Sequence, residues 1–184
     1  LEAFYSKGAQ PITDAFAVSA LRSLLRVLPA FAQSLSEPSI ETCQTAIDAA
    51  SMSGLTYANS WLGIGHSVCH SLGGRYGLSH GAANSVMVLH SLRFNLEAAR
   101  DRLAEIARAT GIASEGDTDP SRMLIAEVER LADRLGTPRT LSAIGLPAGQ
   151  FARIAQDVLA DPQTYWNPRP VTQTEIVAWL QSAW

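Results

Sequence analysis

The chain has few cysteines, few aromatic residues and no excess of positive charge, and abundance of each of these features characterises a particular class of protein. Its 184 residues include two cysteines, and aromatic residues make up 7%. A disulfide-stapled scaffold is excluded, because such scaffolds are rich in cysteine. Cys43 and Cys69 could form one disulfide, but we expect two buried, reduced thiols inside helices. Lysine and arginine number 14 against 17 aspartate and glutamate residues, which gives a net charge of -3. No basic surface for nucleic acid is therefore expected.

Other signals are also missing. No uninterrupted apolar run reaches the ~18–20 residues that span a membrane, and Leu1-Glu2-Ala3 lacks the basic segment of a secretory signal. Alternation typical of strands is nearly absent, and no G-x-G-x-x-G motif follows a strand, so the dinucleotide fingerprint is absent. We expect a cytoplasmic protein without nucleic-acid or membrane partners. The abrupt start, without methionine and inside what the pattern predicts as a helix, fits a piece of a longer protein.

What is present is helical periodicity along nearly the whole chain. The sequence predicts an all-α fold, a bundle of roughly seven to nine helices forming a single domain over residues 1–184. The expected helices begin at Pro11 with a kink or restart at Pro29, then cover 40–59 (central and buried), 62–75, 80–95, 96–110, a segment ending at Gly136, 146–159, and a last helix capped by Thr172 with Glu175.

Three of the four histidines, His66, His70 and His80, lie within fifteen residues. His66 and His70 are four apart, so on a helix their imidazoles share one face, one turn apart. Glycines between His70 and His80 allow the chain to bend back toward that face. The pattern predicts two metal ligands plus a histidine that handles protons or faces substrate. The alternative is a set of surface or structural histidines.

The wider run is more specific. It consists of Asn59-Ser60-Trp61-Leu62-Gly63-Ile64-Gly65-His66, then His70-Ser71-Leu72-Gly73-Gly74, His80-Gly81, Leu89-His90 and Arg93-Phe94-Asn95. In order and spacing it resembles the signature of the iron-containing alcohol dehydrogenase family. The resemblance covers nearly the whole chain, but only the C-terminal helical half of that family, whose fold is of the dehydroquinate synthase-like type. It implies an N-terminal dinucleotide-binding domain that is not in this chain.

The resemblance also implies roles for the histidines. His66 and His80 match two metal ligands, and the family's other two ligands, an Asp and a His, would precede Leu1. His70 matches a histidine beside the nicotinamide and substrate, and it is the expected catalytic residue. The implied cofactors are NAD(H) or NADP(H) and a divalent metal, Fe2+ or Zn2+. The isolated chain is expected to be inactive.

Within the family, Cys69 in its histidine-rich string and the tail from Asn167 to Thr172 look most like maleylacetate reductases, which reduce maleylacetate to 3-oxoadipate in aromatic catabolism. The run from His80 to Asn84 is closer to the alcohol dehydrogenases, so a small alcohol or aldehyde is the alternative substrate. Arg169 is either an anchor for a substrate carboxylate or a structural bridge. A non-catalytic helical interaction domain is a further alternative. The expected partners are a small molecule, the N-terminal domain and a second copy in a homodimer.

Overall fold

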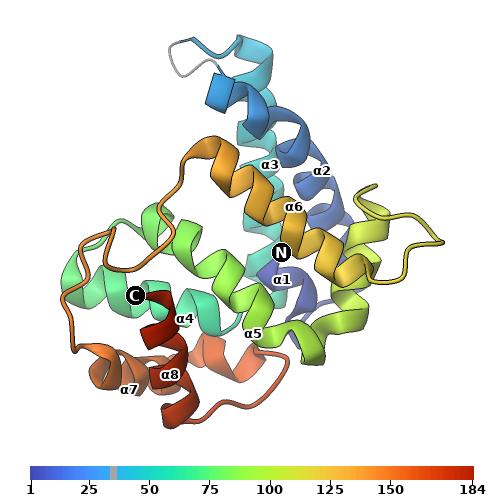
Figure 1. Cartoon of the computed structure of the whole chain (residues 1–184). Helices are drawn as coiled ribbons and strands as arrows, with labels where there is room; N and C mark the ends of the chain where they lie inside the picture. Colours follow the sequence, from blue (N-terminus) through green and yellow to red (C-terminus); the bar gives the residue numbers. More distant parts are fainter. Residues whose placement is uncertain (34–36) are drawn as a thin grey trace. The chain divides into compact units, whose positions relative to one another are not determined.

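The computed structural model describes residues 1–33 and 37–184, and this part of the chain is helical without any strand (Figure 1). The elements are α1 (Glu2–Tyr5), α2 (Pro11–Gln33), α3 (Ile40–Ser60), α4 (Ile64–Tyr76), α5 (His80–Ala109), α6 (Pro120–Leu135), α7 (Phe151–Ala160), the 3-10 helix η1 (Pro162–Trp166) and α8 (Gln173–Ala183). The predicted all-α fold is confirmed.

The chain divides into two compact units. One contains Leu1, residues 3–61 and residues 99–136, and the other contains Glu2, residues 62–98 and residues 137–184. Helix α5 contributes its first part to the second unit and its last part to the first unit. The expectation of one domain over the whole chain stays a prediction.

In the first unit α2 and α3 form a long helical hairpin, drawn in blue and cyan in Figure 1, and α6 packs against α2. The expectation that α3 is central and buried is wrong. Its buried residues are Ala49, Thr56 and Ser60, whereas Ile40 is 89% exposed and Ile47 is 60% exposed. The buried residues of α3 lie on one side of the helix, which packs against α2, and the opposite face is left uncovered.

The expectations for α2 are met in part. The helix continues through Pro29, so a restart there is wrong, while a kink stays a prediction. One missing hydrogen bond does not end a helix that its neighbours hold in place. By length and composition alone its segment 11–32, with a mean hydropathy of 1.4, would also suffice to cross a membrane. The charges of Asp14, Arg22 and Arg26 interrupt that segment, which packs against α3 and α6 and is 17% buried in the described structure.

The second unit carries the histidines. Its core is built from apolar residues of α4, the first half of α5, α7 and α8, including Leu72, Met87, Ile154 and Leu180. Cys69 is also part of this core, and both cysteines are free as predicted, but only Cys69 is buried. The capping box of Thr172 and Glu175 at the start of α8 is confirmed. A packed core behind α4 gives the exposed histidine face of that helix a firm support.

Two predicted boundaries in this unit are wrong. Residues 80–109 form one helix instead of two, because Asn95 is fully buried and bonded to Asn167 rather than ending a helix. Helix α7 begins at Phe151 and not at Leu146, since Gly149 has a φ of 78° and keeps the preceding residues in turns. In both cases tertiary contacts or backbone geometry override local propensity.

Candidate functional site

The site begins at the N-terminus of α4, where side chains distant in sequence satisfy the free backbone donors. The N-cap residue, Gly63, has no side chain to do so. Instead, the Ile64 amide donates to Asn167 at 3.3 Å, and a Glu2 carboxylate accepts from the Gly65 amide at 2.8 Å and the His66 amide at 3.1 Å. A carboxylate is favourable there because helix N-termini carry partial positive charge.

Gly65 is required for this arrangement. A Cβ at position 65 would overlap the hydroxyl of Ser91 on α5, and it would lie 3.0 Å from a Glu2 carboxylate oxygen. The absence of a side chain therefore lets the first turn of α4 approach both α5 and Glu2. The Ser91 hydroxyl is buried in this contact without a hydrogen-bond partner.

Glu2 also binds the first histidine. Its second carboxylate oxygen lies 2.6 Å from Nδ1 of His66, and the Glu2 side chain is 9% exposed. A carboxylate accepts hydrogen bonds only, so in the neutral ring Nδ1 of His66 carries the proton and Nε2 has the lone pair. Carboxylate–histidine pairs of this kind fix the ring and tautomer of histidines that bind metals.

The second histidine has the same kind of partner. Nδ1 of His70 lies 2.8 Å from the Asp161 carboxylate, which is 16% exposed, while the His70 side chain is 45% exposed. Asp161 lies between α7 and η1, where its other oxygen accepts the Gln163 amide at 2.8 Å. His70 therefore stands open to solvent on one side and is held by a fixed carboxylate on the other.

The structure brings the three histidines together. The ring centroids of His66 and His80 are 5.7 Å apart, those of His70 and His80 are 6.1 Å apart and nearly parallel, and those of His66 and His70 are 6.4 Å apart. Burial lowers the pKa of His80, and its two histidine neighbours lower it further. A lowered pKa favours neutral imidazole, which is the form that binds metal.

These residues fit a divalent cation in part. His66 offers a free Nε2 and His80 a neutral ring on the neighbouring helix, and imidazole nitrogen is a good ligand for iron or zinc. Among the described residues no group of three or more His, Cys, Asp or Glu side chains is arranged to hold a metal ion. A cation bound by His66 and His80 therefore needs ligands from outside this chain, and these two assignments stay predictions.

A shallow hollow of about 260 Å³ adjoins His70. It is lined by His70, Ser71, Gly74, Arg75 and Asp157. Asp157 binds the Arg75 guanidinium through two contacts of 2.7 Å and accepts from the Ser71 hydroxyl at 2.8 Å. Hydrogen bonding to Arg75 lowers the pKa of Asp157. The charges of Asp157 and Arg75 therefore compensate each other.

The other candidate residues from the sequence, Cys69, His90 and Arg169, are held by structural contacts. Burial raises the pKa of the Cys69 thiol, so this cysteine is a packing residue. Burial lowers the pKa of His90, whose carbonyl accepts the Trp179 indole at 3.2 Å. Arg169 binds Glu175 at 2.8 Å and stacks on Phe94 at 4.1 Å. These contacts match a structural bridge formed by Arg169 rather than a free anchor for a substrate carboxylate.

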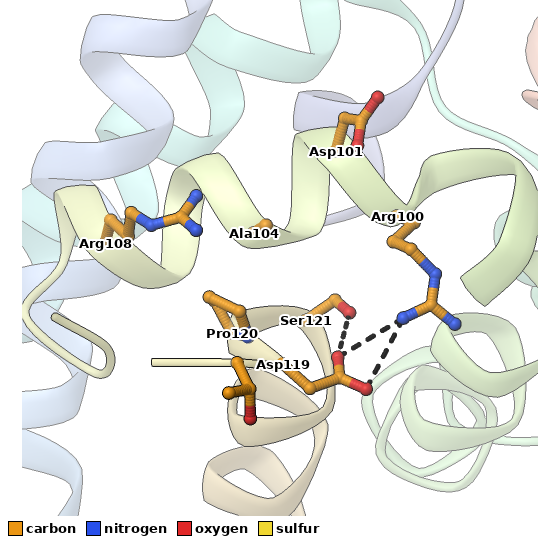
Figure 2. A pocket seen from close by; sticks show the side chains of 8 residues that line it. Arg100, Asp101, Ala104, Arg108, Asp119, Pro120 and Ser121 are labelled. Atoms are coloured by element: carbon orange, nitrogen blue, oxygen red, sulfur yellow. Dashed lines mark hydrogen bonds and ion pairs between the residues drawn. The ribbon is translucent and has the colours of Figure 1, made fainter. Parts of the chain in front are cut away.

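A second hollow, in the first unit, is explained by helix capping. Figure 2 shows its lining residues around the N-terminus of α6, where Asp119 accepts the Ser121 hydroxyl at 2.7 Å and binds Arg100 at 3.3 Å. The same carboxylate accepts the Arg122 amide as the N-cap. Asp119 therefore already neutralises Arg100, whereas Asp101 and Arg108, which also line the hollow, have no interaction drawn to the other lining residues in Figure 2.

Sequence reasoning missed Glu2 and Asp161, the two carboxylates of the site. Glu2 is 64 residues from His66, and Asp161 is 91 residues from His70. The spacing of residues in the sequence does not reveal partners that are so far apart along the chain. The one available signal was Asp161-Pro162, since an N-cap aspartate followed by proline marks a helix start.

Comparison with known proteins agrees with this geometry. The family model for the C-terminal region of the Fe-containing alcohol dehydrogenase family matches residues 1–184. The 1,3-propanediol dehydrogenase of Klebsiella pneumoniae is 33% identical over 100% of this chain and 47% of its own length. The maleylacetate reductase of Rhizobium sp. (strain MTP-10005) is 32% identical over 99% of this chain and 48% of its own length. The chain thus spans about half the length of these relatives.

Solved structures give the same result. A 1,3-propanediol oxidoreductase superposes with a TM-score of 0.90 at 33% identity, covering 100% of this chain and 48% of that chain. Maleylacetate reductase from Agrobacterium tumefaciens superposes with a TM-score of 0.81 at 31% identity and the same coverage. Because the family model matches every residue and the histidine-bearing helices share this fold, the chain belongs to the iron-containing alcohol dehydrogenase family, as a domain of its C-terminal type.

Proposed function

We propose that this chain forms the metal- and substrate-binding side of a cytoplasmic NAD(P)-dependent oxidoreductase, in which His66 and His80 bind a divalent cation and His70 is the catalytic residue. The observation that carries the proposal is the cluster of three imidazoles, of which His66 and His70 each have Nδ1 bound to a carboxylate. The dinucleotide-binding domain would come from the other half of a longer protein.

The chain's own residues account for part of the chemistry. A divalent cation at His66 and His80 would act as a Lewis acid toward a carbonyl or alcohol oxygen. Oxidation of an alcohol removes a hydride from carbon and a proton from oxygen. Nε2 of His70 is free to take that proton because Nδ1 is engaged by Asp161. Glu2 and the buried first turn of α4 hold His66 in place for its ligand role.

A small alcohol or aldehyde is the substrate class that we favour. Arg169, the residue considered as an anchor for a dicarboxylate, is paired with Glu175, and this pairing leaves its charge compensated. The run from His80 to Asn84 also resembles the alcohol dehydrogenases. Relatives of similar identity act on 1,3-propanediol and, by name, on methanol and lactaldehyde.

Maleylacetate reduction is the second candidate. Two maleylacetate reductases are 32% and 30% identical to the chain, and the strings around Cys69 and from Asn167 to Thr172 resemble that group. A full-length protein assayed with 1,3-propanediol, lactaldehyde and maleylacetate, each with both nicotinamide cofactors, separates the two candidates. Failure with all three substrates, together with no binding of either cofactor, would support the non-catalytic interaction domain instead.

The residue roles are tested by measuring turnover and metal content together. His66→Ala and His80→Ala are expected to lower metal content first, whereas His70→Ala is expected to lower kcat by on the order of 10²–10⁴ with metal retained. His90→Ala is the matched control, because His90 is a partly buried histidine of the same unit that lies outside the cluster of three. Loss of metal in His70→Ala as complete as in His66→Ala would show that the roles are misassigned.

A further inference from the structure

Asp161 has two tasks because its two carboxylate oxygens are engaged separately. One oxygen accepts the Gln163 amide at 2.8 Å and so caps η1, and it also lies 3.4 Å from the Ser67 hydroxyl. The other oxygen lies 2.8 Å from Nδ1 of His70. The cap fixes the direction of the carboxylate, and the carboxylate then meets an imidazole on a different helix.

The surroundings of Asp161 strengthen this orientation. The Ser67 hydroxyl, on the turn of α4 before His70, donates to the Gly63 carbonyl at 3.2 Å and accepts from the Thr164 hydroxyl at 2.8 Å. Thr164 belongs to η1, so its bond to Ser67 joins α4 to η1 next to the Asp161–His70 contact. Rotation of the Asp161 side chain would break the cap, which makes its position stable.

The contact decides which ring nitrogen carries the proton in neutral His70. A carboxylate only accepts, so Nδ1 must donate, and the lone pair is then on Nε2. In the opposite tautomer a lone pair would face a carboxylate, and Nε2 would hold a proton that prevents it from accepting another. His70 contributes to alcohol oxidation only in the first tautomer.

We propose that Asp161 is a positioning residue that sets the tautomer and direction of His70 by holding Nδ1–H. The inference rests on the proposed function for its catalytic consequence, but the tautomer itself is a property of the chain. The cap is what turns an ordinary aspartate into a rigid acceptor. Asp161 therefore acts on the reaction only through His70.

Asp161→Asn tests the proposal sharply. The asparagine carbonyl oxygen can still cap η1, since asparagine is as good an N-cap as aspartate. The amide nitrogen then occupies the place of the oxygen that faces His70, and it can only donate. A donor opposite Nδ1 favours the tautomer with the proton on Nε2. The substitution thus retains the fold-supporting bond and reverses the bond that faces the imidazole.

The experiment uses the full-length protein labelled with 15N-histidine and treated with chelator to remove metal. At alkaline pH, where imidazole is neutral, ring 15N shifts distinguish a protonated nitrogen from one with a lone pair. His70→Gln identifies the His70 signals. We expect Nδ1–H in the unmodified protein, the proton moved to Nε2 in Asp161→Asn, and kcat lowered by at least tenfold in that variant with a smaller change in KM.

Asp119→Asn is the matched control. Asp119 is also an N-cap carboxylate, at α6, and its side-chain contacts are to Ser121, Arg100 and the Arg122 guanidinium. The same chemical change there is expected to leave the His70 signals and kcat unchanged. Thermal melting of each variant shows whether the fold is retained.

Each outcome decides the proposal. Nε2–H in the unmodified protein would overturn it without any variant, which covers the case in which Asp161→Asn fails to fold. A reversed tautomer with unchanged kcat would overturn the catalytic part. If the unmodified protein shows no turnover with any substrate, the proposed function fails, while a tautomer reversed in Asp161→Asn still supports the positioning role.

Discussion

The carboxylate of Glu2 lies 2.6 Å from Nδ1 of His66 and at the same time accepts the backbone amides of Gly65 and His66. One side chain therefore caps the N-terminus of α4 and orients the first imidazole on that helix. Because the cap and the imidazole contact use the same carboxylate, a change in one is transmitted to the other. This coupling makes Glu2 the residue whose replacement is most informative about His66.

Glu2→Gln is expected to weaken metal binding. Glutamine keeps one acceptor oxygen in place of two. If that oxygen accepts the Gly65 amide, the NH₂ group faces Nδ1 of His66 and cannot accept from it; in the other orientation Nδ1–H bonds a neutral amide instead of a carboxylate. Loss of a carboxylate partner behind a metal-binding histidine typically costs about 10–100-fold in metal affinity. The measurement is the Zn2+ dissociation constant of the full-length protein by equilibrium competition with a chelator.

Glu41→Gln is the control for this substitution. Glu41 lies in the first turn of α3 and is exposed, so its variant should bind Zn2+ as the unmodified protein does. Equal affinity in Glu2→Gln and Glu41→Gln would show that Glu2 is only a helix cap.

Gly65→Ala is expected to destabilise the protein, because the new Cβ would overlap the Ser91 hydroxyl and crowd the Glu2 carboxylate. Overpacking of this kind costs about 1–3 kcal/mol. The matched control is Gly74→Ala on the same helix, where a Cβ meets nothing within 4 Å. Since alanine is the better helix former, Gly74→Ala should raise the free energy of unfolding by up to ~1 kcal/mol. Urea unfolding of both variants measures the two changes.

A second substitution identifies the cause of the Gly65→Ala effect. Removing the Ser91 side chain makes room for the new Cβ, so Ser91→Gly combined with Gly65→Ala should cost less than the two single changes added together. Strictly additive costs would mean that the clash with Ser91 is not the source of the loss.

Local pattern predicted the helices and the histidine face, but not what holds that face in position. The spacing of His66 and His70, the Thr172–Glu175 capping box and the glycine stop at Gly136 are each encoded within a few residues, and each is confirmed. The site carboxylates are not encoded in this way, because Glu2 and Asp161 reach their histidines only through the tertiary fold.

The wrong helix end at Asn95 has the same origin. Asparagine has low propensity inside helices and often ends them, and its local sequence gives no sign of a partner 72 residues away. Its contact with Asn167 satisfies the amide and allows α5 to continue. Spacing in the sequence located the histidines and the family resemblance suggested their roles, while the residues bonded to them are identified only by the tertiary structure.

The Asn95–Asn167 pair gives a stability prediction. Each amide nitrogen donates to the other side chain's oxygen, at 3.0 and 2.9 Å, and Asn167 also binds the Ile64 amide and the Arg169 carbonyl. Both side chains are fully buried. Asn167→Ala leaves several buried polar groups without partners, and each costs about 1–3 kcal/mol. We expect a larger loss than for Asn95→Ala, measured as the free energy of unfolding in urea.

An exposed amide provides the comparison. Asn84 on α5 donates only to the His80 carbonyl one turn earlier, and Asn84→Ala should change the free energy of unfolding by less than about 0.5 kcal/mol. A change in Asn167→Ala as small as this would contradict the account, since the buried groups would then have found other partners.

The Arg169–Glu175 pair predicts a dependence of stability on pH. The guanidinium of Arg169 and the Thr172 hydroxyl hold the pKa of Glu175 at about 2, below its ordinary value of 4.5. A carboxyl with a lower pKa in the folded than in the unfolded state stabilises the fold fully above pH 4.5, and this contribution disappears as the pH falls toward 2. Arg169→Gln should raise the pKa of Glu175 without restoring it fully, because Thr172 still donates. Carboxyl 13C shifts followed against pH measure this change.

Thermal melting provides the second measurement. The difference in melting temperature between Arg169→Gln and the unmodified protein should shrink from pH 5 to pH 2. A melting-temperature difference that is constant over this range would mean that Arg169 stabilises the loop only by stacking on Phe94.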